Sequence, residues 1–170
     1  MGAYRRAVRG AEAGAIAAAS LEGSFFLLDL IRLQPLATPV VLAGVLPGPN
    51  VFVLDLTSSS GIADALWAAY QIGTLTVVHF VSFGVVGVVV SLLFDWRQPL
   101  EAKRLLLLAT LCSAAFFCTV SVTSSVFALD SVGWLPIMGT NVLAAVVLGG
   151  SLRLVSKSEP DGEAVLQAAS

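Results

Sequence analysis

The feature that most constrains this chain is a series of long apolar segments that contain few charged residues. They run from about residue 11 to 31, 62 to 94, 102 to 128 and 134 to 155. An α-helix needs about 20 predominantly apolar residues to cross the roughly 30 Å hydrocarbon core of a bilayer. Each segment meets that requirement, so the sequence predicts an all-α integral membrane bundle of four transmembrane helices.

The overall composition favours a membrane protein over a water-soluble domain. Of the 170 residues, 57% are hydrophobic and only 12% are charged, whereas a soluble domain carries about 25% charged residues. The basic pairs Arg5-Arg6 and Lys103-Arg104 are too short to form a nucleic-acid surface. We therefore expect the lipid bilayer to be the main partner, and no nucleic acid.

The segment between the first two spans, residues 32–61, is mostly apolar but is interrupted by prolines. Its apolar part, 36–46, is too short to cross the membrane, and proline disfavours a continuous helix. We predict a short helix or surface loop that lies on the outer face or dips into it. The transmembrane domain then occupies residues 1–157, and 158–170 form a flexible cytoplasmic tail.

The positions of Lys and Arg predict the orientation, because the cytoplasmic loops of membrane proteins carry the excess of basic residues. Four spans with both termini inside leave only Arg32 on the outer side. The cytoplasmic side then holds Arg5, Arg6, Arg9, Arg97, Lys103, Arg104, Arg153 and Lys157. We expect a multi-pass protein of a bacterial inner membrane with cytoplasmic N- and C-termini.

A few ionisable residues fall inside the apolar segments, where insertion of such a group costs roughly 2.5–3.5 kcal/mol. Glu22 lies near the middle of the first span, and His79 lies near the middle of the second. The two spans run in opposite directions, so these residues reach a similar depth and can form a hydrogen-bonded pair. Asp29 lies two helical turns from Glu22 on nearly the same face, and Arg32 can pair with it.

Together with Gln71 and Asn141, these residues predict a polar seam inside the bundle. The seam is either a proton path or small-ligand site, or a set of interhelical hydrogen bonds that fixes the register of the helices. A single histidine cannot supply bis-His ligation of haem. Asp29 is offset from Glu22 by roughly 10 Å along the helix axis, too far for a shared ligand shell. We therefore expect no metal and no cofactor.

Small residues recur at helical spacing in two of the predicted spans. Gly10 and Gly14 form a Gly-x-x-x-Gly pattern, and Gly84 and Gly87 form an i, i+3 pair. Such residues let two helix backbones approach closely in a membrane. They indicate close helix contact without naming the partner helix.

Three short motifs resemble an uncharacterised family of small bacterial four-span membrane proteins. They are Asp29-Leu…Pro35-Leu-x-Thr38-Pro39, His79-Phe80-x-x-Phe83-x-x-x-Gly87 and Asn141-x-x-Ala144-Ala145…Gly149-Gly150. The resemblance covers all four spans and implies the four-helix architecture, but it brings no assigned activity. Glu22 lies where this pattern has an apolar or aromatic residue, so the resemblance implies no role for it.

The chain contains no Ser-His-Asp order, His-Glu-x-x-His or paired-histidine motif, so we expect no enzymatic activity. Two classes of function remain. The first is an accessory or structural subunit of a larger bacterial membrane complex of the respiratory or photosynthetic type, with other membrane subunits or further copies of itself as partners. The second is a small oligomeric transporter or proton-linked carrier that uses Glu22, Asp29 and His79.

Overall fold

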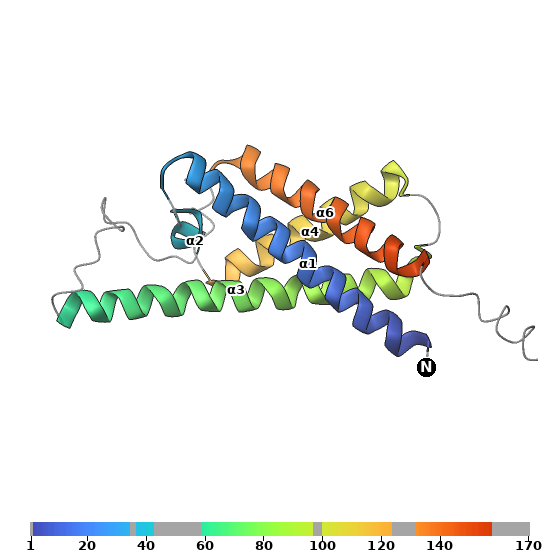
Figure 1. Cartoon of the computed structure of the whole chain (residues 1–170), viewed down its shortest axis with the longest axis horizontal. Coiled ribbons are helices and arrows are strands. Elements are labelled where there is room, and N and C mark those ends of the chain that lie inside the picture. Colours follow the sequence, from blue (N-terminus) through green and yellow to red (C-terminus); the bar gives the residue numbers. More distant parts are fainter. Residues whose placement is uncertain (1, 35–36, 43–58, 97–99, 124–131, 158–170) are drawn as a thin grey trace, which may run out of the picture.

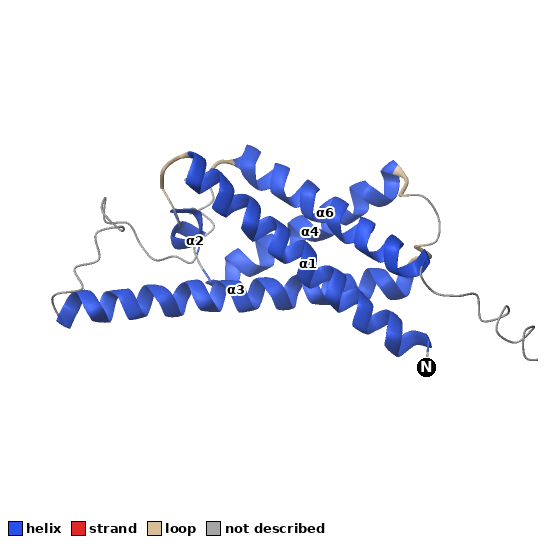
Figure 2. Cartoon of the chain, in the orientation of Figure 1, coloured by secondary structure: helices blue, strands red, loops and turns tan. Residues whose placement is uncertain are grey.

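Helices make up the computed structural model, which describes residues 2–34, 37–42, 59–96, 100–123 and 132–157 (Figures 1 and 2). Within these residues the chain forms α-helices and no strand. In chain order the helices are α1 (Gly2–Ile31), α2 (Ala37–Leu42), α3 (Ser59–Leu93), α4 (Ala102–Thr123) and α6 (Trp134–Lys157).

Four of these helices, α1, α3, α4 and α6, are long and apolar enough to cross a membrane, which confirms the predicted all-α bundle. The helices do not stop where the apolar segments stop. Helix α1 begins at Gly2, nine residues before the predicted span, because charged residues such as Arg5 can continue a helix beyond the hydrocarbon. The predicted end of the third span at residue 128 and the predicted tail, 158–170, lie outside the described residues.

The four long helices form a ring in which each packs against two neighbours. Helix α1 packs against α3 and α6, and α4 packs against the same two helices. Consecutive long helices run in opposite directions, so the start of α1 and the end of α6 lie at one end of the bundle (Figure 1). We call this the terminal end, and we call the opposite end, where α2 lies, the α2 end.

Apolar side chains from all four long helices fill the interior of the ring. Leu21, Phe83, Phe116 and Leu148, one from each helix, are almost completely buried. Other apolar side chains face outward, among them Val77, Val81 and Val85 at every fourth position of α3. A stripe with this spacing covers one face of a helix, and acyl chains of a bilayer are its natural surroundings.

Helices α1 and α3 touch at a contact made of glycines. A Cβ atom added to Gly10, Gly14 or Gly87 would come closer than 3.0 Å to a backbone carbonyl of the facing helix. At the same contact the Ser91 hydroxyl donates a shared hydrogen bond to two carbonyl oxygens, that of Arg6 at 2.9 Å and that of Val88 at 2.8 Å. The small residues seen in the sequence therefore join α1 to α3.

From this glycine contact, α1 and α3 diverge toward the α2 end, and α2 packs in the gap against both (Figure 1). Thr38, Val40 and Leu42 of α2 are buried there. The predicted short helix between the first two spans is confirmed. Its packing between the two long helices, and not merely over them, is a feature that the proline pattern did not reveal.

Candidate functional site

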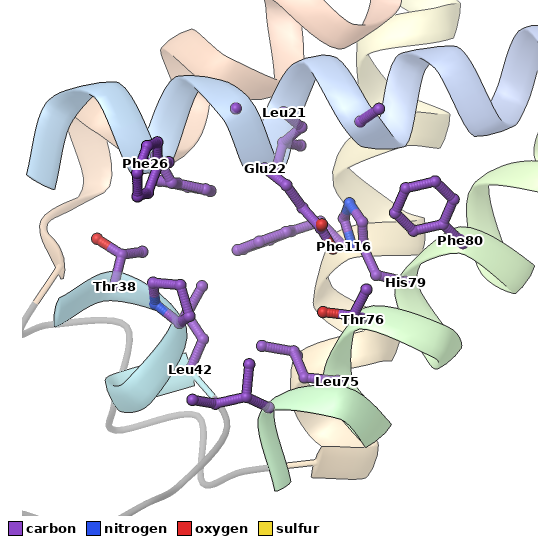
Figure 3. Close-up of a pocket in the computed structure, with 15 residues that line it drawn as sticks. Leu21, Glu22, Phe26, Thr38, Leu42, Leu75, Thr76, His79, Phe80 and Phe116 are labelled. Carbon is purple, nitrogen blue, oxygen red and sulfur yellow. The ribbon is translucent and has the colours of Figure 1, made fainter. Parts of the chain in front are cut away.

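A cavity of about 410 Å³ occupies the gap between α1, α2 and α3 (Figure 3). We call it the wedge cavity. Its walls are mainly apolar, with Leu21, Phe25, Phe26, Leu42, Leu75, Phe80 and Phe116 among them, and its polar side chains are Glu22, Thr38, Thr76 and His79. Ligand sites in proteins measure roughly 300–1,000 Å³ and have mostly apolar walls with a few polar groups. The wedge cavity has both properties.

The geometry of the helices explains why the cavity exists. Because α1 and α3 touch at the glycine contact and then separate, side chains beyond that contact cannot reach across the gap. Two small residues of α1, Ala19 and Gly23, line it, and a Cβ added to Gly23 would meet no atom within 4 Å. Helix α2 fills only the end of the gap, so a space remains behind it.

Glu22 and His79 line the wedge cavity from two helices, and both side chains point into it (Figure 3). The sequence predicted their similar depth, and the structure brings them to the same cavity. Both residues are described, and no hydrogen bond joins them. The His79 ring packs 4.5 Å from the ring of Phe83 and 6.2 Å from that of Phe116, and its buried Nε2 atom has no hydrogen-bond partner.

Asp29 attaches α2 to α1. Its Oδ2 accepts a hydrogen bond from the Thr38 backbone N–H at 2.7 Å, and its Oδ1 accepts one from the Thr38 hydroxyl at 2.7 Å. Both residues are buried. The first N–H groups of a helix have no partner within the helix, so the carboxylate satisfies one of them in α2. We call this pair of bonds the Asp29–Thr38 latch.

The predicted pairing of Arg32 with Asp29 is not formed, because the chain turns sharply after α1. Gln34 N–H donates to the Asp29 carbonyl oxygen at 2.9 Å, and Leu33 N–H donates to the Leu30 carbonyl oxygen at 3.0 Å. This is the Schellman arrangement that ends many helices. The turn directs Arg32 into an exposed position and carries Thr38 back to the carboxylate in its place.

The remaining members of the predicted seam lie away from the wedge cavity. Gln71 is half-buried on α3 and does not line the cavity. Asn141 is fully buried on α6, where its Nδ2 donates to the Ile137 carbonyl oxygen at 2.8 Å and its Oδ1 has no partner. The structure thus brings Glu22 and His79 to one cavity, which the other seam residues do not line.

Sequence reasoning missed two parts of this site. The first is Thr38 as the partner of Asp29, although both residues belong to the same motif. The second is the group of phenylalanines around the cavity. In the sequence, these phenylalanines could have been found from their positions beside the polar residues: Phe80 follows His79, and Phe25 and Phe26 come one helical turn after Glu22.

The four candidate membrane-spanning helices define a multi-pass membrane protein, and α1, α3 and α4 contribute residues to the lining of the wedge cavity. In the described part of the chain, no group of three or more His, Cys, Asp or Glu side chains could hold a metal ion. Comparison with protein-family models, with curated proteins and with solved structures gives no match. The function is therefore inferred from the wedge cavity and from the surfaces of the helices.

Proposed function

We propose that this chain is a small, non-enzymatic carrier that takes up a small and largely apolar molecule into the wedge cavity. The observation that supports the proposal is that Glu22 and His79, which come from two helices, line one cavity with apolar walls. A buried polar atom without a partner is costly, above all where no water is present. A ligand with one polar group and an apolar body pairs with Glu22 and fills the space.

Binding to the purified protein tests the proposal. Two aromatic probes of related shape, tetraphenylphosphonium and triphenylphosphine oxide, are titrated onto the protein in detergent, and the complexes are weighed by native mass spectrometry. We expect at least one probe to bind, and Gly23→Trp to abolish its binding by filling the cavity. Gly139→Trp is the matched control, because a Cβ at Gly139 also meets no atom within 4 Å but Gly139 does not line the cavity.

Two results would contradict the binding function. One is that neither probe binds to the unmodified protein. The other is that the Gly23→Trp variant binds as tightly as the Gly139→Trp variant. Proton linkage is tested separately in proteoliposomes that contain a pH-sensitive dye: transport of the probe in exchange for protons should change the internal pH, and His79→Ala should remove that change.

A second candidate, an accessory or structural subunit of a larger bacterial membrane complex of the respiratory or photosynthetic type, is supported by the start of α3. This part of the helix projects beyond the bundle (Figure 1), and it exposes Ile62, Leu66, Trp67 and Tyr70. Exposed apolar patches of this kind mark contacts with other proteins or with lipid. Purification from native membranes should then yield a stoichiometric partner chain; a single species containing only this chain would contradict it.

For the location, we propose a bacterial inner membrane with both termini in the cytoplasm. Basic residues gather at the terminal end of the bundle: Arg5, Arg6 and Arg9 lie in the first turns of α1, and Lys103 and Arg104 begin α4. Because cytoplasmic ends of membrane helices carry such residues, their common location supports this orientation.

A further inference from the structure

We propose that the wedge cavity takes a lipophilic organic cation, with the Glu22 carboxylate as its counter-charge and phenylalanine rings as its walls. This inference rests on the proposed binding function and names the chemical class of the ligand. It follows from two properties of the described lining residues, their charge and their aromatic content.

The charge of the lining is one-sided. Among the lining residues that the structure describes, Glu22 is the one carboxylate, and none is Lys or Arg. The neighbouring carboxylate of Asp29 is engaged on both oxygens by Thr38. A carboxylate in apolar surroundings needs a cation or a set of donors. The described residues provide no ion pair for Glu22. A cation bound in the cavity would supply the missing positive charge.

The aromatic content of the lining favours the same class of ligand. Phe25 and Phe26 of α1, Phe80 of α3 and Phe116 of α4 surround the space from three helices, and the rings of Phe25 and Phe116 lie 6.0 Å apart. Organic cations are recognised by aromatic faces within about 6 Å, because the ring quadrupole attracts positive charge. A carboxylate among aromatic rings therefore matches a charged centre that carries apolar substituents.

Other ligand classes fit less well. An anion would be repelled by Glu22. A purely apolar molecule would bury the Glu22 carboxylate without a partner, which is the costly arrangement for polar groups. A neutral hydrogen-bonding molecule can donate to Glu22 but leaves the charge of Glu22 uncompensated.

The test compares a cation with a neutral molecule of related shape. We expect the protein in detergent to bind tetraphenylphosphonium about tenfold more tightly than triphenylphosphine oxide, which corresponds to about 1.4 kcal/mol. Glu22→Gln should remove this preference and leave the affinity for the oxide unchanged. Glu12→Gln is the matched control, because Glu12 is exposed on the same helix and does not line the cavity; it should keep the preference.

The outcomes separate the two proposals. Equal binding of both probes, or an unchanged preference in Glu22→Gln, overturns the cation assignment, while binding that Gly23→Trp abolishes still supports the carrier. Binding of neither probe overturns both. If Glu22→Gln does not fold, Phe80→Leu decides: loss of one aromatic wall should weaken tetraphenylphosphonium binding severalfold with Glu22 in place, and unchanged binding overturns the assignment.

Discussion

At the scale of single residues, Asp29 decides how α2 is attached to the bundle. In Asp29→Ala, the N–H and the hydroxyl of Thr38 lose their acceptor while they remain buried. We expect the free energy of unfolding to fall by about 1–3 kcal/mol, the cost of leaving such donors unsatisfied. Thermal unfolding in detergent measures the change.

The control for this substitution is Asp64→Ala, because Asp64 is an exposed carboxylate on α3. Its Tm should stay close to that of the unmodified protein. Equal losses of Tm in the two variants would show that the Asp29–Thr38 latch contributes no stability of its own.

His79 presents the opposite case, a buried polar residue that the fold does not use. Its Nε2 has no partner, while its ring packs against Phe83. His79→Phe keeps the aromatic packing and removes the unsatisfied atom, so we expect the free energy of unfolding to stay equal or to rise by about 1 kcal/mol. His79→Ala should destabilise, because it enlarges a cavity. Similar losses of Tm in both variants would assign His79 a structural role.

At the scale of elements, the glycine contact between α1 and α3 sets their separation. A Cβ on Gly87 would collide with the Gly10 carbonyl, whereas a Cβ on Gly84, one turn away, would meet no atom within 4 Å. We expect Gly87→Ala to destabilise by about 1–3 kcal/mol, as overpacking does, and Gly84→Ala to be neutral or stabilising. Thermal unfolding of the two alanine variants is the comparison; matching Tm values would argue against close contact at this crossing.

The turn that ends α1 offers a stabilising substitution. Leu33 has a φ of 57°, a left-handed conformation that costs non-glycine residues roughly 1–2 kcal/mol, and its side chain is 88% exposed. Leu33→Gly should therefore raise the free energy of unfolding by about 1 kcal/mol. The matched control Leu106→Gly, an exposed residue inside α4, should lower it by about that amount. A fall in Tm for Leu33→Gly would mean that its side chain has a partner that offsets the strain.

At the scale of the whole molecule, the antiparallel order of the helices predicts the accessibility of the two ends. In a Cys118→Ala background, a cysteine at Arg5 marks the terminal end and a cysteine at Leu33 marks the α2 end. We expect an impermeant maleimide to label Leu33→Cys in intact cells and Arg5→Cys only after the membrane is opened. Labelling in the reverse order would invert the proposed orientation, and labelling of both in intact cells would contradict the crossing of α1.

How much of the candidate site could be predicted depends on the range of the interactions involved. The similar depth of Glu22 and His79 follows from helical rise and from the opposite directions of two neighbouring spans. The partner of Asp29 could not be deduced in this way, because it lies nine residues farther along the chain and comes into reach only through the turn at Leu33. The short spacing between Asp29 and Arg32 in the sequence favoured Arg32 as the partner of Asp29, but the same turn leaves Arg32 exposed.

The sequence by itself determined the existence, the order and the alternating direction of the four long helices, because segment length and hydropathy act locally along the chain. It also determined which residues permit close helix contact. Only the tertiary structure decided that Gly10 and Gly14 meet α3 near Gly87, that the two helices then diverge, and that α2 leaves the wedge cavity open behind it. These features depend on the angle between packed helices. That angle is determined jointly by side chains from distant parts of the chain.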